Sequence, residues 1–405
     1  HVFNVKDHRE LYSFPAGGAR RIVLCARLHP TDPQLTSFIV DGMNQLQAWI
    51  DLKARPRKLW QVSVQPRTGV NGPPTVTVFD FDGDGNKEIL TGLPGNRLAV
   101  LNDLGQVVKE WQLDAPVIDW AVGNFNGDSC YDILAVVSPR ILDQTTVLLD
   151  LKKEDANPVW TRAGFGAYTG WPVVWDVNRD GIDDMIVRYF YMRHMIDGRN
   201  GLDVFPITWR QGYHCPTIVL PDGPDREPLM VWSGAAYTHR VERLDGSEVW
   251  NHWAQSMYRP GCVGDFNGDG RIETVCQTTG TLYDLGTQFD NLKFEPLDES
   301  YSGYLFTWDV QTGQETGRFD LGETVLEGSV SGDVDGDGRD EILVGTVQGS
   351  LMILGIGENG LGIEWRRDFG ASVGRPTIAD IDLDGNPELL VGIETGNIVV
   401  LECRK

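Results

Sequence analysis

Apolar and polar positions alternate along this chain in short runs that repeat. In residues 74–113, an apolar run at 75–79 precedes an acidic loop, and further apolar runs follow at 89–91, 98–101 and 107–113, the last around Trp111. Runs of this length, rich in β-branched residues and bounded by Gly, Asn and Asp, are typical of strands joined by tight turns. Strand runs do not alternate with helical periodicity, so the chain is predicted to be all-β and a parallel α/β fold is disfavoured.

The four-strand pattern recurs at intervals of about 40–50 residues, which predicts one repeat array. Four antiparallel strands repeated radially make a β-propeller, so we expect eight four-stranded blades in a single domain, residues 1–405. The expected blades span 20–65, 74–113, 116–163, 170–210, 215–252, 258–320, 326–368 and 373–405. The last has only three strands, and we expect residues 1–15, through a strand at 10–14, to close the array. Seven blades is the alternative, because 20–65 and 215–252 lack a full acidic loop.

Six of the expected blades share an acidic loop between their first and second strands. It carries Asp or Asn at positions one and three, Asp at position five and Asp or Glu at position nine, as in Asp333, Asp335, Asp337 and Glu341. Calcium prefers several oxygen ligands, and the loop glycines permit a tight turn in which alternate side chains converge. The loop is not an EF-hand, because its twelfth position is Val344 and strands flank it. Acidic turns without metal are the alternative.

The four polar positions of each loop are the predicted calcium ligands, and we expect up to six structural ions. The predicted ligands are Asp80, Asp82, Asp84, Glu88, Asn124, Asn126, Asp128, Asp132, Asp176, Asn178, Asp180, Asp184, Asp265, Asn267, Asp269, Glu273, Asp333, Asp335, Asp337, Glu341, Asp380, Asp382, Asp384 and Glu388.

These loops and the strands after them, such as Glu341-Ile-Leu-Val-Gly and Glu388-Leu-Leu-Val-Gly, resemble FG-GAP or VCBS-type repeats. Such repeats build integrin alpha-subunit propellers and the rhamnogalacturonan lyases of polysaccharide lyase family 11. The resemblance covers nearly the whole chain and implies a calcium-binding propeller, and an eight-bladed count fits the lyases better than integrins. No catalytic motif of the lyase family matches residue by residue, so no role is transferred from it.

Charge and apolar content exclude several partners. The formal net charge is −23, which argues against nucleic acid. No apolar run approaches the roughly 20 residues of a membrane span. Calcium sites of this kind suit a secreted, extracellular or periplasmic protein, and the start at His1 without a Met is interpreted as a processed end. We expect a monomer.

Tyr, His, Arg and Trp gather in segments that we place on the face opposite the acidic loops. We expect 188–194 to form the loop between the second and third strands of the fourth blade, and 237–240 that of the fifth, with 209–214 crossing between the two blades. The equivalent segments of the second, seventh and eighth blades are short and are not rich in Tyr, His, Arg or Trp. A basic, aromatic face on a chain of net charge −23 predicts an anionic polysaccharide as ligand.

β-Elimination at a uronic acid fits these residue types. The reaction needs a cation to neutralise the carboxylate, a base to remove the C5 proton and an acid to protonate the leaving oxygen. The predicted catalytic residues are Tyr213, His214, Tyr237, His239, Arg240, Tyr258, Arg259 and His194. The predicted substrate-binding residues are Arg188, Tyr191, Arg193, Arg199, Tyr168, Trp171, Arg210, His252 and Trp253.

Other functions fit the same residues. A non-catalytic lectin or adhesion propeller would explain the aromatic segments equally well. A glycoside hydrolase needs a pair of facing carboxylates, and these segments are poor in acids. A quinone-dependent dehydrogenase ranks third. Trp171, Trp209 and Trp253 would also fit simple packing between blades.

Overall fold

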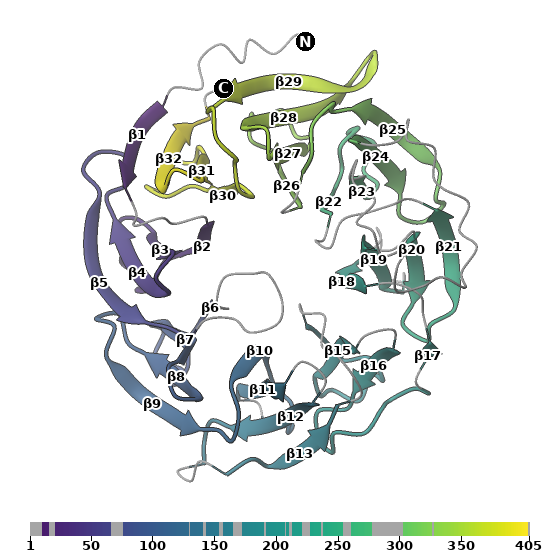
Figure 1. Cartoon of the computed structure of the whole chain (residues 1–405). Helices are drawn as coiled ribbons and strands as arrows, with labels where there is room; N and C mark the ends of the chain where they lie inside the picture. Colours follow the sequence, from purple (N-terminus) through teal and green to yellow (C-terminus); the bar gives the residue numbers. More distant parts are fainter. Residues whose placement is uncertain are drawn as a thin grey trace. The chain divides into compact units, whose positions relative to one another are not determined.

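The chain belongs to the β-propeller class, with eight four-stranded antiparallel sheets (Figure 1). The computed structural model describes residues 10–15, 21–65, 76–128, 130–140, 143–153, 157–164, 172–189, 192–206, 208–209, 213–220, 227–235, 238–253, 261–277, 303–325 and 328–403. This described part of the chain is built from strands and turns and contains no helix. It therefore contains no helix long and apolar enough to cross a membrane.

The chain divides into two compact units, and the first holds residues 8–210 and 377–404. Five sheets lie in this unit. Their strands are β1 (Glu10–Pro15) with β30 (Thr377–Ala379), β31 (Glu388–Gly392) and β32 (Asn397–Glu402); β2 (Arg21–Ala26), β3 (Thr36–Val40), β4 (Gln45–Ile50) and β5 (Arg57–Ser63); β6 (Val76–Phe79), β7 (Glu88–Leu93), β8 (Arg97–Leu101) and β9 (Val107–Gln112); β10 (Val117–Gly123), β11 (Asp132–Arg140), β12 (Asp143–Asp150) and β13 (Trp160–Ala163); and β14 (Val173–Trp175), β15 (Asp184–Tyr189), β16 (Met192–Ile196) and β17 (Thr208–Trp209).

The second unit holds residues 211–376 and the remaining three sheets. Their strands are β18 (Tyr213–Val219), β19 (Leu229–Ala235), β20 (Thr238–Arg243) and β21 (Glu248–Trp253); β22 (Val263–Gly264), β23 (Glu273–Gln277), β24 (Tyr304–Asp309) and β25 (Glu315–Asp320); and β26 (Ser329–Gly332), β27 (Glu341–Gly345), β28 (Ser350–Gly357) and β29 (Gly360–Asp368). Each expected blade segment thus contains one sheet, and the seven-bladed alternative is wrong.

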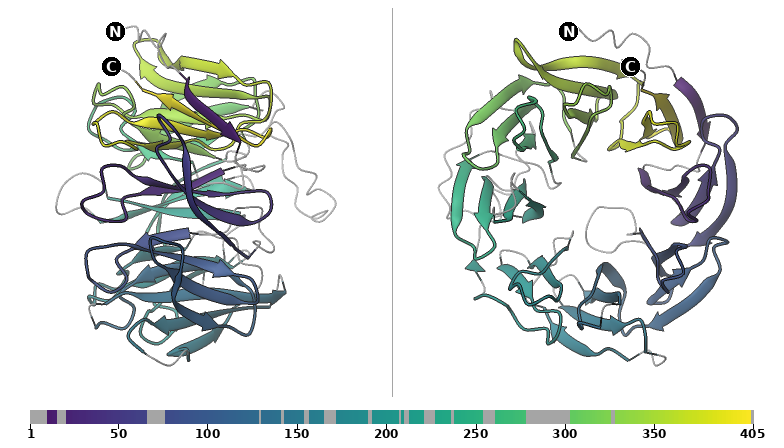
Figure 2. Two further views of the ribbon diagram at one scale, coloured as in Figure 1. Left: turned by 90° about the vertical axis from the view of Figure 1, so that its left-hand side faces the viewer. Right: turned by 180° about the vertical axis from the view of Figure 1, so that it is seen from behind.

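The first and last described strands of the chain share one sheet. β1 pairs antiparallel with β32, with Ser13 opposite Val399 and Phe14 opposite Ile398. Figure 2 shows this purple strand beside the yellow C-terminal strands from two further sides. The expected closing role of the N-terminal strand is confirmed.

Burial follows the order of strands within each sheet. The second strand is buried on both faces, as in β27 and β31, where every residue is buried. The fourth strand alternates, as in β29, because one of its faces meets solvent. Apolar side chains of neighbouring sheets merge into shared clusters, and one of these joins Phe266 and Val275 with Ile342 and Met352. Packing between sheets therefore explains the near-continuous apolar runs of the sequence.

A tryptophan on the fourth strand fixes one sheet to the next. The Trp250 indole nitrogen in β21 donates to the Val310 carbonyl at 2.8 Å, beyond the end of β24 in the following sheet. The ring packs on Gly313, where a Cβ atom would lie 2.7 Å from the Trp250 ring. Trp60 packs in the same way on Gly105, and Trp160 on Gly201. These glycines all have positive φ, which glycine adopts without strain.

Candidate functional site

Each acidic loop joins the first strand of its sheet to the second and is shaped by its own carboxylates. In the loop after β6, the Asp80 carboxylate accepts hydrogen bonds from the Gly83 and Gly85 amides at 2.7 and 3.0 Å. Asp82 accepts the Asp84 amide at 3.2 Å, and Asp84 accepts the Asn86 amide at 2.7 Å. The first acidic position thus folds the loop over itself, and alternate side chains turn to one side.

The acid at the ninth position begins the second strand and points back into the loop. Glu88 Oε2 accepts the Phe81 amide at 2.8 Å. The corresponding bond recurs in the other five loops, from Phe125 to Asp132, Val177 to Asp184, Phe266 to Glu273, Val334 to Glu341 and Ile381 to Glu388. One carboxylate oxygen is therefore held by backbone in every loop. The second oxygen also has a partner in four loops: the side-chain amides of Asn126 and Asn267 for Asp132 and Glu273, the Gly198 amide for Asp184, and Lys53 for Glu388.

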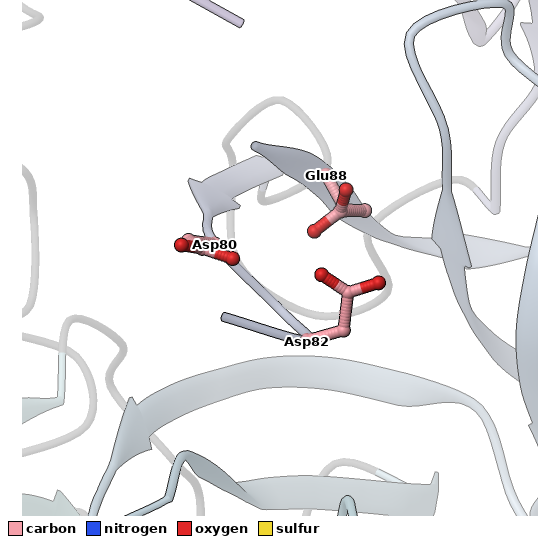
Figure 3. A group of neighbouring side chains, drawn as sticks. All are labelled: Asp80, Asp82 and Glu88. Atoms are coloured by element: carbon pink, nitrogen blue, oxygen red, sulfur yellow. The ribbon is translucent and has the colours of Figure 1, made fainter. Parts of the chain in front are cut away.

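Three loops bring three carboxylates to one point. Asp80, Asp82 and Glu88 each offer an oxygen within 4.8 Å of the other two, and Figure 3 shows their carboxylates facing one another. The same holds for Asp333, Asp335 and Glu341, and for Asp380, Asp382 and Glu388. The loops at 124, 176 and 265 have Asn in place of Asp at position one or three. The donor set, all oxygen and mostly anionic, fits a hard divalent cation.

Burial makes the ninth-position acids costly to ionise without a cation. Burial raises the pKa of Glu341 to about 9 and the pKa of Glu273 to about 7. The backbone hydrogen bond that each side chain accepts lowers the pKa, but by less than burial raises it. Burial likewise raises the pKa of Asp132 to about 7 and of Asp184 to about 6. A cation among these oxygens would favour the ionised form and reverse this direction.

A further acid, absent from the predicted set, lies opposite the ninth-position acid in three sheets. Asp150, at the end of β12, pairs by register with Asp132. Asp309 pairs with Glu273, and Glu402 pairs with Glu388. Like charges directly opposite each other destabilise a sheet unless something neutralises them. An acid ending the third strand was the sequence signal that could have identified these residues.

The sixth loop contains a basic side chain from the adjacent sheet. Lys53, in the turn between β4 and β5, places its Nζ 2.8 Å from Asp382 Oδ2 and 2.8 Å from Glu388 Oε1. Asp384 Oδ2 is 3.2 Å away and Glu402 Oε1 3.6 Å. Burial opposes the charged form of Lys53, but hydrogen bonds to Asp382 and Glu388 raise its pKa above the ordinary value. Lys53 therefore stays an ammonium ion.

The predicted polysaccharide residues are divided between the two units and are described within each. In the first unit, Arg188 lies in β15, and Arg193 and His194 in β16, not in a loop as expected. His194 is 1% exposed and its Nδ1 donates to Asp203 Oδ1 at 2.9 Å. Arg199 lies at the surface and pairs with Asp180 of the third acidic loop. Tyr168, Trp171, Tyr191 and Arg210 lie outside the described residues.

In the second unit, the strands again extend further than the sequence indicated. Tyr213 and His214 begin β18, His239 and Arg240 lie in β20, and His252 and Trp253 end β21. The expected loop position of these residues is wrong, because the strand pairs β18–β19 and β20–β21 continue through them. Tyr237, Tyr258 and Arg259 lie outside the described residues.

His239 occupies a packed core position. It is 0% exposed, and its Nε2 hydrogen-bonds the Thr274 hydroxyl at 2.9 Å. Its ring lies 5.9 Å from Trp250 and 5.3 Å from Trp308, measured between centroids. Burial lowers the pKa of His239 to about 3, and the charge of His252 acts in the same direction. This environment keeps the imidazole neutral and places it among core aromatic rings.

His252 and Arg240 are also held by protein partners. His252 Nε2 donates to the Gly313 carbonyl at 2.7 Å, and its ring is tilted against that of Trp250, with 5.0 Å between the centroids. Arg240 is 5% exposed and lies 3.7 Å from the Glu242 carboxylate. His239 and His252 therefore join two neighbouring sheets, and their closeness in the sequence reflects this packing.

Comparisons with known proteins support the fold class. No family model matches the sequence, and no curated protein matches it. The structure resembles that of Sqt1 from Saccharomyces cerevisiae, with a TM-score of 0.66 and 9% identity over 98% of this chain and 100% of that one. It resembles a europium-containing methanol dehydrogenase, with a TM-score of 0.65 and 12% identity over 96% and 85% of the two chains. For the biofilm matrix protein Bap1 of V. cholerae the TM-score is 0.58, with 15% identity over 99% and 89%. At these identities the likeness extends to the fold alone.

Proposed function

We propose that the acidic loops bind structural calcium ions. The observation that carries this proposal is the convergence of Asp80, Asp82 and Glu88, and of Asp333, Asp335 and Glu341, within 4.8 Å at equivalent places in two sheets. Carboxylates held this close repel one another unless a cation lies between them. The resemblance of the loops to FG-GAP repeats supports calcium in particular. Calcium titration of the chelated protein, followed by isothermal calorimetry, tests the proposal, and absence of binding would refute it.

We propose further that the protein binds an anionic, uronic-acid-containing polysaccharide and cleaves it by β-elimination, outside the cell or in the periplasm. Its support is the set of Tyr213, His214, Tyr237, Tyr258 and Arg259, which would supply a base, an acid and a carboxylate clamp. His239 is dropped from the catalytic set, because a neutral, fully buried imidazole cannot reach a polymer in solvent. The calcium ions have no part in the elimination.

A carbohydrate-binding propeller without catalysis is the second candidate. The observation that favours it is the burial of His194, His239 and Arg240, which removes all the catalytic candidates whose side chains are described. Absorbance near 235 nm during incubation with a panel of uronic-acid polysaccharides separates the two functions. A rise reports the unsaturated product of elimination and supports the lyase. A flat trace together with retarded migration in a polysaccharide-containing gel supports the lectin.

A further inference from the structure

The sixth acidic loop differs from the others in having a cation from the chain itself. The Lys53 ammonium lies 2.8 Å from both Asp382 Oδ2 and Glu388 Oε1, with Asp384 Oδ2 at 3.2 Å. Asp382 and Glu388 are two of the three carboxylates that converge at this loop. A calcium ion would need oxygens at about 2.3–2.6 Å from the same point, and two cations cannot share it.

The backbone of Lys53 is fixed beside the loop. Leu52, its neighbour, is 3% exposed and packs in one apolar cluster with Ile381, which is the second residue of the sixth loop. The Asp51 carbonyl accepts the Ala54 amide at 3.2 Å and the Arg55 amide at 3.0 Å, which closes the turn that presents Lys53. The ammonium position therefore follows from core packing as well as from attraction to the acids.

The equivalent basic residue of another sheet, Lys152, makes different contacts. The motif Asp51-Leu-Lys53 recurs as Asp150-Leu-Lys152 at the end of β12. Lys152 is 54% exposed, and it pairs with Asp128, at 3.0 Å, in the loop of its own sheet. The side chain of Lys53 is 17% exposed and approaches four carboxylates of the adjacent sheet, those of Asp382, Asp384, Glu388 and Glu402. The sheet β2–β5 has no full acidic loop to compete for it.

We propose that Lys53 supplies the cation of the sixth loop, which therefore holds an ammonium group where the other acidic loops hold calcium. The assignment rests on the proposed calcium binding for those other loops. The replacement of calcium by Lys53 affects one sheet, because the sixth loop joins β30 to β31 in the sheet that also contains β1 and β32. That sheet would not need metal.

The test counts calcium ions per chain in the full-length protein, by equilibrium dialysis and atomic emission spectroscopy. Asp335→Ala in the fifth loop removes an oxygen ligand altogether and should lower the count by one. Asp382→Ala, at the same position of the sixth loop, should leave it unchanged. A loss of one ion in Asp382→Ala would overturn the proposal, and this comparison needs no change at Lys53.

A second comparison removes the ammonium. Lys53→Met should bind one calcium ion more than the wild type, whereas Lys152→Met should not change the count. A folded Lys53→Met protein with the wild-type count contradicts the proposal. If the wild type binds no calcium at all, the calcium assignment fails, and Lys53 is then tested by melting in chelator. There Lys53→Met should lower the Tm and Lys152→Met should not, and equal values for the two variants would overturn the role of Lys53.

Discussion

Asp183 and Asn124 join two consecutive acidic loops by a pair of hydrogen bonds. Asp183 Oδ2 accepts the Asn124 amide at 2.8 Å, and the Asp183 amide donates to the Asn124 carbonyl at 3.0 Å. Asp183 is the eighth residue of the third loop, and Asn124 is the first of the second loop. Asp340 and Asp265 form the same pair in the other unit. The second and fourth acidic loops are thus each held in place by the next loop.

Replacement of Asp183 by Ala should destabilise the protein by about 1–3 kcal/mol, because it leaves the half-buried Asn124 amide without its acceptor. Urea unfolding in excess calcium measures the difference. Asp340→Ala should show a loss of similar size in the other unit. Glu358→Ala is the control at an exposed acid, expected within about 0.5 kcal/mol of wild type. Equal stability of Asp183→Ala and Glu358→Ala would contradict the prediction.

Removal of calcium should lower the melting temperature by roughly 10 °C, because each ion bound at 100 times its Kd contributes about 2.7 kcal/mol to the folded state. Differential scanning calorimetry with and without EGTA measures this shift. Calcium should restore the original Tm, whereas the same concentration of magnesium should restore less, because it demands a tighter octahedral site. An unchanged Tm would show that the loops fold without metal.

Gly313→Ala should destabilise the protein by several kcal/mol, more than Gly322→Ala does. Both glycines have positive φ, 70° and 62°, so both substitutions carry the same backbone strain. A Cβ at Gly313 would also lie 2.7 Å from the Trp250 ring, whereas one at Gly322 meets nothing within 4 Å. The difference between the two chemical denaturation midpoints isolates the contact of Trp250 with the next sheet. Equal midpoints would show that the Trp250 ring accommodates the added methyl group at little cost in stability.

Acid should destabilise the protein in part through His239. The folded-state pKa of His239 is lowered to about 3, so between pH 6.5 and pH 3 the unfolded chain binds a proton that the folded chain does not. Stability therefore falls as the pH drops through this window, by on the order of 2 kcal/mol from His239 alone at pH 5. Unfolding of wild type and His239→Gln at pH 7.5 and pH 5 measures the contribution. The variant should lose less stability on acidification, and parallel losses would contradict the assignment.

Tyr213→Phe should abolish the rise in absorbance at 235 nm, if a substrate is found, and should leave the Tm nearly unchanged. The substitution removes only the hydroxyl group that would donate or accept the proton. Tyr131→Phe, at a tyrosine that is 48% exposed in the second acidic loop, is the control and should keep full activity. Undiminished turnover in Tyr213→Phe would exclude Tyr213 from the reaction.

The repeated loops explain why so much of the fold was predictable. A loop such as Asp333 to Glu341 marks the turn between a first and a second strand, and six copies set the register of the sheets. The two segments without a full loop, 20–65 and 215–252, were assigned from the repeated four-strand pattern, and both form four-stranded sheets. Periodic local signals therefore determined the architecture.

The candidate polysaccharide site was less predictable, because contacts between sheets leave no periodic signal. His239 and His252 were expected at a surface, but His239 is fully buried and His252 is partly buried, with its ring beside that of Trp250. The contacts of Lys53 could not be predicted from the sequence for the same reason. Its partners Asp382 and Glu388 lie far along the sequence, and only the folded chain brings them together.

The pairing of β1 with β32 makes one sheet depend on both extremes of the folded chain. Glu10 is opposite Leu401, so this ladder has the largest sequence separation among the described strand pairs. During synthesis β1 emerges before the other described strands, and its partner β32 is made after them. Contacts between residues so far apart in the sequence form late and slowly, because forming them closes a very long loop and costs chain entropy. We therefore expect the sheet β1–β32–β31–β30 to be the last to gain protection from hydrogen exchange during refolding.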